Sequence, residues 1–217
     1  MQMIRRALTT AALMVFAGAA VSDDSYRVTA VFDTLFDAQG QVAGLRPHDQ
    51  SAYPAAFWEV VRQRVGLLRI PPPTDAATGR PATLSTGLYV TLQVTPDRQG
   101  NGVLKIVDLD VKPLVLQQVH AAFPPELVRS AGWTGAVQAE CVVGTDGRCG
   151  DVKVKALPGM PQSLLRWARD TMELWEFEPP RLNGRPIMAP TRASFELETP
   201  DIAPVNFIER GSGQFRW

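Results

Sequence analysis

Histidine, cysteine and paired acidic residues are the side chains that could do chemistry in this sequence, and they are few. The two histidines, His48 and His120, have no second metal ligand at the spacing that zinc sites use. Asp108 and Asp110 alternate along a strand-like stretch, without the contrasting environments that general acid–base catalysis needs. Motifs for a serine nucleophile elbow, a phosphate loop or a dinucleotide fold are absent from the sequence. We therefore predict that the protein is not an enzyme and has no catalytic residue, no cofactor and no metal site.

The two cysteines, Cys141 and Cys149, flank an Asp146-Gly147 pair that is typical of a hairpin turn. A two-residue turn would place Cys141 opposite residue 152, so a β-bulge after the turn is needed to bring the sulfur atoms together. Two interpretations stay open. The cysteines form a disulfide in an oxidising compartment, or they are two buried thiols that pack as small apolar side chains.

The first residues are typical of an export signal. Arg5 and Arg6 form a basic region, residues 7–20 are uncharged and mostly apolar, and small residues precede Asp23. The apolar run is shorter than the ~20 residues that span a membrane. We therefore expect residues 1–22 to be a cleaved signal peptide and the mature chain to be periplasmic. Retention of this segment as an inner-membrane anchor is the alternative.

The rest of the chain reads as two copies of one unit. Residues 28–73 match residues 135–180 without a gap, and the shared positions include Gly40 with Gly147 and Pro54 with Pro161. In both copies the same order follows: a strand of alternating apolar residues, a turn, a second strand, a helix that starts at a proline, and a last strand. We therefore predict an α+β fold of two tandem β-β-α-β units, each a small antiparallel sheet packed on a helix. Two unrelated α+β units that share generic turn residues are the alternative.

The expected elements and domains follow from this pattern. The first unit is expected to have strands at 28–36, 42–45 and 88–95 and a helix at 54–68. The second is expected to have strands at 136–143, 151–156 and 193–199, a helix at 161–175 and an extra short helix at 126–131. The expected domains are a signal peptide at 1–22, a first unit at 23–112, a second unit at 113–203 and a C-terminal tail at 204–217.

Five motifs in the second unit occur in an order and spacing that are specific, although no single motif is. They are Phe123-Pro124-Pro125-Glu126-Leu127, Ala131-Gly132-Trp133-Thr134-Gly135, Thr145-Asp146-Gly147-Arg148, Trp175-Glu176-Phe177-Glu178-Pro179 and Asn183-Gly184-Arg185-Pro186. With these motifs, residues 115–200 resemble the C-terminal domain of the TonB energy-transducer family. Residues 26–96 resemble a degenerate second copy of that domain.

The resemblance implies a protein-binding module whose last strand accepts a partner segment as a further strand. The candidate edge consists of Arg192, Ala193, Ser194, Phe195, Glu196, Leu197 and Glu198, with Ala193, Phe195 and Leu197 towards the core and the others on the opposite face. We expect Trp175 and Phe177 to be structural, because burying each ring is worth roughly 1.5–3 kcal/mol in a small domain. The alternative is an edge that binds no partner, because the charges of Glu196 and Glu198 discourage strand pairing.

These features together predict a periplasmic module that binds a protein of the cell envelope, either an outer-membrane protein or a second copy of the chain. Two other functions stay open: a membrane-anchored TonB-like energy transducer or envelope transport component, and a self-associating structural envelope protein. The anchored alternative requires residues 1–22 to remain in the membrane. The chain has 22 basic and 22 acidic side chains, so it lacks the strongly basic surface of a nucleic-acid-binding protein.

Overall fold

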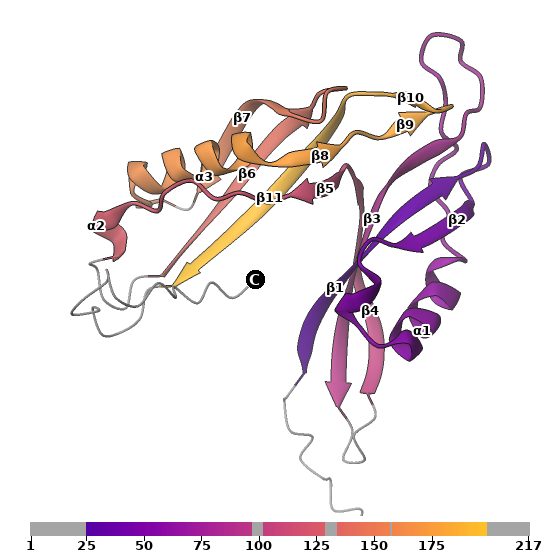
Figure 1. The fold of residues 1–217 in the computed structure, drawn as a ribbon, viewed down its shortest axis with the longest axis horizontal. Helices are drawn as coiled ribbons and strands as arrows, with labels where there is room; N and C mark the ends of the chain where they lie inside the picture. The colour runs from indigo at the N-terminus through magenta and orange to yellow at the C-terminus, as the bar shows by residue number, and fades with distance from the viewer. Residues whose placement is uncertain (1–24, 97–101, 129–133, 157, 199–217) are drawn as a thin grey trace, which may run out of the picture.

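The computed structural model describes residues 25–96, 102–128, 134–156 and 158–198. Over these residues the chain is a mixed α+β protein of mostly antiparallel sheets with few helices, as predicted (Figure 1). The expected signal peptide at 1–22 and tail at 204–217 lie outside the described residues, as do residues 129–131 of the expected extra helix. Within the described parts, no helix is both long and apolar enough to cross a membrane.

The first sheet has four main strands in the order β2-β1-β3-β4. They are β1 (Tyr26–Phe36), β2 (Val42–Pro47), β3 (Leu84–Pro96) and β4 (Gly102–Lys112). Strand β3 pairs with β1 along one edge and with β4 along the other, all antiparallel. Alternate residues of β1 and β3 are apolar, so one face of the sheet is buried against α1 (Ala55–Val65), which follows the short helix η1 (Gln50–Ala52). The core between them consists of Ala30, Phe32, Trp58, Val61, Val65, Leu88, Val90 and Leu92.

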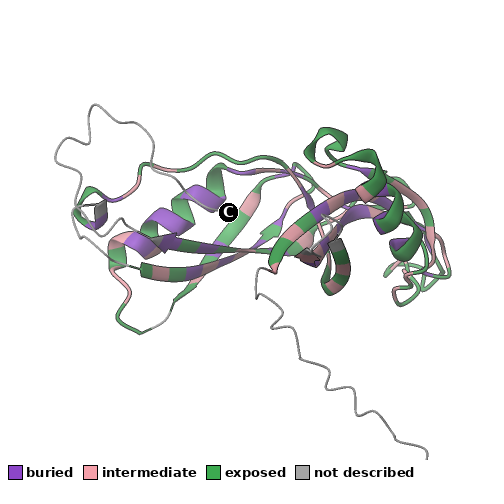
Figure 2. Cartoon of the chain, turned by 90° about the horizontal axis from the view of Figure 1, so that it is seen from below, coloured by how far each residue is buried: buried purple, intermediate pink, exposed green. Residues whose placement is uncertain are grey.

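The second sheet has three strands in the order β11-β6-β7. They are β6 (Thr134–Val143), β7 (Cys149–Ala156) and β11 (Ala189–Glu198). Helix α3 (Gln162–Leu174) covers one face, and the alternation of buried and exposed residues along the strands follows from this one-sided packing (Figure 2). The last strand begins earlier than expected, because Ala189 and Pro190 already pair with β6.

The spacing of Leu164, Leu165, Ala168, Met172 and Trp175 by three and four residues predicts one apolar stripe on helix α3, and the buried stripe is wider. Leu164, Ala168 and Met172 are buried as expected, and Leu165 is only partly buried. The predicted stripe leaves out Trp167 and Thr171, which are also buried. The indole Nε1 of Trp167 donates to the carbonyl of Ala121 (2.9 Å), and the Thr171 hydroxyl accepts from the Ala121 N–H (3.1 Å). These two polar contacts dock the segment before β6 onto the helix.

Several short elements supplement the main strands and helices, and one of them joins the two halves of the chain. Strand β5 (Leu114–Gln117) pairs with β8 (Glu176–Glu178). The one-turn helix α2 (Pro125–Val128) agrees with the start of the extra helix expected at 126–131. Strands β9 (Arg181–Leu182) and β10 (Arg185–Pro186) form a hairpin whose β9 pairs with the start of β3 in the first sheet. Residues of the second half therefore contribute to the first sheet.

Two edge strands, β4 of the first sheet and β11 of the second, approach each other at one end. They come together where β4 ends and β11 begins, and they diverge from there (Figure 1). Among the described residues, no strand pairs with the outer edge of either.

Candidate functional site

Strand β11 is a regular edge strand. It pairs with β6 over its whole length, from Ala189 opposite Val143 to Glu198 opposite Thr134, without a register shift. In an antiparallel strand, alternate residues direct their N–H and C=O groups to opposite edges. Half of the backbone groups of β11 therefore point away from β6, towards an edge with no strand partner in the described parts of the chain.

The side chains of β11 alternate between the core and solvent. Ala193, Phe195 and Leu197 face α3, and Phe195 and Leu197 are buried. Arg192, Ser194 and Glu196 are exposed on the opposite face, while the side chain of Glu198 lies outside the described residues. The edge therefore combines a fixed apolar side with a polar side that is free to meet another chain.

A cluster of aromatic rings holds β11 in place. The ring of Phe195 lies 5.3 Å from that of Trp167 and 5.8 Å from that of Trp175. Trp175 and Phe177 are buried, with 6% and 3% of their surface exposed. Such ring pairs add about 0.5–1.5 kcal/mol each beyond their buried area. Trp175 and Phe177 thus lie under the candidate edge and do not present a ligand-binding surface.

The β6–β7 hairpin is clamped to the segment after α3 through Gly147. Gly147 has a φ of 79°, and its carbonyl accepts the N–H of Phe177 (2.9 Å). A Cβ at this position would collide with the carbonyl oxygen of Phe177. The carboxylate of Asp146 accepts the N–H of Arg148 (3.1 Å), and the Arg148 guanidinium pairs with Glu176. The hairpin signature and the Trp-x-Phe signature therefore meet at one point of the fold.

Cys141 and Cys149 form a disulfide with a Cα–Cα distance of 5.6 Å. The strand register differs from that of a simple two-residue hairpin. Cys149 lies across from Val143, and the register shifts between Glu140 and Val142. Asp151 adopts a φ of 49° at this irregularity. A β-bulge of this kind is what the sequence spacing required. It also makes β7 the irregular edge of the sheet, in contrast to β11.

The other motif residues surround this hairpin or lie apart from it. Phe123 packs edge-on against Trp167 at 5.3 Å, and Pro124 is buried just before α2. Gly135 lies in β6, and Pro179 separates β8 from β9. Gly184, with a φ of 78°, lies in the β9–β10 turn beside the first sheet, away from β11.

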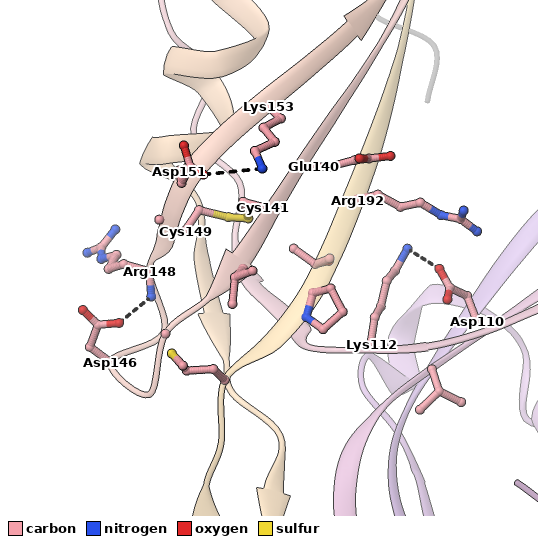
Figure 3. Close-up of a pocket in the computed structure, with 17 residues that line it drawn as sticks. Asp110, Lys112, Glu140, Cys141, Asp146, Arg148, Cys149, Asp151, Lys153 and Arg192 are labelled. Carbon is pink, nitrogen blue, oxygen red and sulfur yellow. Dashed lines mark hydrogen bonds and ion pairs between the residues drawn. A yellow bond between two sulfur atoms is a disulfide. The ribbon is translucent and has the colours of Figure 1, made fainter. Parts of the chain in front are cut away.

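A groove of about 820 Å³ adjoins the first residues of β11. The end of β4, the start of β11 and the face of β6 and β7 that points away from α3 line it (Figure 3). Its apolar residues include Val142, Met188 and Pro190, and Met188 is 68% exposed. The sequence pattern did not reveal this groove, since its lining comes from three segments that lie far apart in the chain.

Charged side chains around the groove are mostly paired with each other. Lys112 pairs with Asp110 (3.1 Å), and Lys153 pairs with Asp151 (3.7 Å). The carboxylate of Glu140, which lines the groove, accepts hydrogen bonds from Lys155 at 2.7 and 2.8 Å. The Arg148 guanidinium forms an ion pair with the Glu176 carboxylate. Each of these charged side chains is therefore paired with an oppositely charged neighbour. Arg192 is the exception, because no ion pair to it is found among the described residues.

Tyr89 supports the wall formed by β4. Its hydroxyl donates to the carbonyl of Pro113 (3.1 Å) and accepts the N–H of Val115 (3.0 Å). Burial raises the pKa of Tyr89 to about 12. The ammonium of Lys112 lies 4.4 Å above the centre of the Tyr89 ring. These contacts fix the turn between β4 and β5, at the end of the groove.

A three-stranded antiparallel sheet with a helix on one face and an open last strand defines a class of small interaction domain. Within the described residues, no cluster of three or more His, Cys, Asp or Glu side chains could hold a metal ion. Residues 120–197 match the family model described as Gram-negative bacterial TonB protein, C-terminal. The chain therefore carries a TonB C-terminal family domain over these residues, as its motifs predicted. No curated protein matches the chain.

The family match gives the coarse function of this domain. TonB C-terminal domains are periplasmic modules that interact with proteins of the cell envelope, such as outer-membrane receptors, in a transport context. The matched segment includes α3, the hairpin and all of β11 except its last residue. It leaves strands β1 to β5 outside the match, so the match itself carries no statement about residues 25–119.

Proposed function

We propose that this protein is a periplasmic binding module that holds a segment of a partner protein by strand addition at β11, without catalytic activity. The observation that carries the proposal is the open outer edge of β11, a ten-residue strand with an unbroken register to β6. Main-chain hydrogen bonds along such an edge provide affinity, and alternate side chains provide specificity. The candidate edge residues are those from Arg192 to Glu198.

The two edges of this sheet differ in a way that favours β11. Strand β7 contains the bulge, and Asp151 within it has a left-handed backbone. Lys153 and Lys155 project from the same strand and are exposed. Bulges and lysines are features that discourage strand pairing at an edge. Strand β11 lacks a bulge, and its exposed residues Arg192, Ser194 and Glu196 carry mixed charge.

We also propose that the chain is a tandem duplication of one β-β-α-β unit. Gly40 in the first hairpin has a φ of 76°, its carbonyl accepts the N–H of Ile70 (2.9 Å), and a Cβ there would collide with the Ile70 oxygen. Gly147 and Phe177 make the same set of contacts in the second half. A shared turn residue alone does not account for a shared long-range contact, which supports common origin.

The two units differ at the edge that matters for binding. Strand β3 takes the place in the first sheet that β11 takes in the second, since each pairs with the first strand of its unit. Strand β4 covers the outer edge of β3, whereas the outer edge of β11 is open in the described residues. We therefore assign partner binding to the second unit. We place the boundary between the units near residue 113, with the β9–β10 hairpin reaching back to the first sheet.

Photo-cross-linking in cells tests the proposal. Ser194 on β11 and Lys155 on β7 lie in one row of the sheet, on either side of Gln138, and both are exposed. A photoreactive amino acid at position 194 should capture an envelope protein, and the same amino acid at position 155 should not. Equal capture from both positions, or none from 194, would contradict strand addition at β11. Capture of a second copy of the chain would instead support the self-associating alternative.

A further inference from the structure

The two units share a second hairpin, which follows the helix and carries an arginine just after its turn glycine. In the first unit this sequence is Gly79-Arg80-Pro81, and Pro81 pairs with Thr74. In the second unit it is Gly184-Arg185-Pro186, and Pro186 pairs with Arg181. Both glycines have a left-handed backbone, with φ of 66° and 78°. We call residues 74–81 and 181–186 the two arginine turns.

A pair of hydrogen bonds brings the two arginine turns together. The backbone N–H of Asn183 donates to the carbonyl of Thr83 (2.9 Å), and the side-chain oxygen of Asn183 accepts the N–H of Thr83 (3.0 Å). Asn183 lies within the second turn, and Thr83 follows the first by two residues. Figure 1 accordingly shows the loop between α1 and β3 beside the β9–β10 hairpin. The duplicated arginines therefore lie on one part of the surface.

This surface carries positive charge that the chain does not neutralise. Arg80, Arg181 and Arg185 are exposed, and no ion pair to any of them is found in the parts of the chain that the structure describes. Residues 71–83 and 179–188 contain one acidic side chain, that of Asp75. Its carboxylate accepts the backbone N–H groups of Ala77 (2.8 Å) and Thr78 (3.3 Å), within its own turn. Three guanidinium groups thus remain available to an anionic partner.

The shape of the two arginine turns favours a broad partner over an enclosed one. A Cβ at Gly79 or Gly184 would have no atom within 4 Å apart from those of its chain neighbours, so both turns project into solvent. Small ligands bind in recesses that surround them. A bilayer with anionic headgroups needs only matching charge, and it attracts clusters of basic side chains at its surface. A convex, basic surface fits a bilayer better than it fits a single small anion.

We infer that the two arginine turns together bind the surface of a membrane that contains anionic phospholipids, through Arg80, Arg181 and Arg185. This inference goes beyond strand addition at β11 and does not rest on it. TonB C-terminal domains are periplasmic, and membranes border that compartment on both sides. Strand β10 ends at Pro186 and β11 begins at Ala189. Binding through the turns therefore holds the start of β11 close to the lipid headgroups.

Sedimentation with lipid vesicles tests the inference on the full chain, purified from cells that export it. The protein should sediment with vesicles of phosphatidylcholine and phosphatidylglycerol, and not with vesicles of phosphatidylcholine alone. Added salt should release it, because salt screens exposed charges. Each arginine at an anionic bilayer contributes about five-fold to binding. The double variant Arg80→Gln with Arg185→Gln should therefore bind about 25-fold more weakly than wild type.

Two further double variants make the comparison specific. Arg166→Gln with Arg169→Gln removes the same charge from exposed positions on α3 and should bind as wild type does. Arg80→Lys with Arg185→Lys should also bind nearly as wild type does, because a bilayer attracts the charge and does not require the planar fork of arginine. All variants share one N-terminus, so any contribution of residues 1–22 is equal among them. Thermal unfolding checks that each variant is folded.

Several outcomes would overturn the inference. One is a wild-type protein that does not sediment with the anionic vesicles, and another is an equal loss of binding in the two glutamine double variants. Loss of binding in the lysine double variant would point instead to a site that recognises one carboxylate or phosphate through the arginine fork. Capture of an acidic envelope protein by a photoreactive amino acid at position 80, without vesicle binding, would assign the surface to a protein partner.

Discussion

Phe177 donates its backbone N–H to the carbonyl of Gly147, and its own carbonyl occupies the space where a Cβ of Gly147 would lie. This contact joins the tip of the β6–β7 hairpin to the residue that follows α3. It fixes the hairpin end of the sheet, where β11 begins, relative to the helix. The open edge at β11 therefore belongs to a sheet that is already held at its hairpin end.

Gly147→Ala should destabilise the protein strongly. The substitution adds left-handed backbone strain of about 1–2 kcal/mol to a collision with the Phe177 carbonyl. Gly159→Ala is a matched control, because Gly159 has a φ of 89° and open space around its Cβ position. Chemical denaturation should show a clearly larger loss for Gly147→Ala than for Gly159→Ala. Equal losses would mean that strain alone, and not the close contact with Phe177, makes glycine necessary.

Removal of the disulfide should lower the free energy of unfolding by about 2–3 kcal/mol, the range for a short closed loop. The variant that tests this is the double replacement Cys141→Ala with Cys149→Ala. A reducing agent should lower the stability of the wild-type chain by a similar amount and should leave the double variant unchanged. If the reducing agent destabilised both proteins equally, the effect would not come from Cys141 and Cys149.

Phe177→Ala should cost about 3–5 kcal/mol, because it removes a buried aromatic ring. Leu174→Ala, at the end of α3, should cost much less because Leu174 is 44% exposed. Denaturant titration of the two variants measures the difference. A Phe177→Ala protein as stable as wild type would show that the Trp-x-Phe signature is not part of the core, and would reopen a ligand-binding role for it.

Tyr89→Phe should lower stability by about 1–3 kcal/mol, because the N–H of Val115 loses its acceptor and the carbonyl of Pro113 loses its donor. The raised pKa of Tyr89, about 12 against a reference of 10.0, also sets a pH dependence. Above pH 10 the unfolded tyrosine releases its proton while the folded one keeps it. The stability contribution of Tyr89 is therefore complete below pH 10 and falls as pH rises from 10 to 12.

Ultraviolet absorbance of tyrosinate measures this ionisation directly. The wild-type titration should contain a component near pH 12 that is missing in Tyr89→Phe. Tyr26→Phe is the control variant for the stability measurement. It should change the free energy of unfolding little, because Tyr26 is 55% exposed. Loss of the same component in Tyr26→Phe, but not in Tyr89→Phe, would contradict the assignment.

Sequence periodicity predicted the elements that bury one regular face. The alternation of Ala30, Phe32 and Phe36 and the three-four spacing of Leu164, Ala168 and Met172 each appear as buried rows. The predicted apolar stripe of α3 did not include Trp167, because this residue lies at the margin of the helix face. In the structure the segment around Ala121 covers it. That long-range contact and those with the rings of Phe123 and Phe195 make the position interior.

The short strands and the groove could not be predicted for a related reason. Strands β9 and β10 have two residues each, too few to show a period, and β9 is held by pairing with Leu84 and Ser85. Lys112, Met188 and Arg192 meet at the groove because two sheets approach each other. No local pattern encodes that approach. The candidate edge itself was recognisable because its alternating residues resemble a known family.

Amide hydrogen exchange along β11 in the protein without a partner tests the open edge most directly. The account predicts a period of two from residue 191 to 197: amides bonded to β6 exchange slowly, and the alternate amides, which point to the open edge, exchange fast. Uniform protection of all these amides would contradict the account, because it would mean that another strand already occupies the edge.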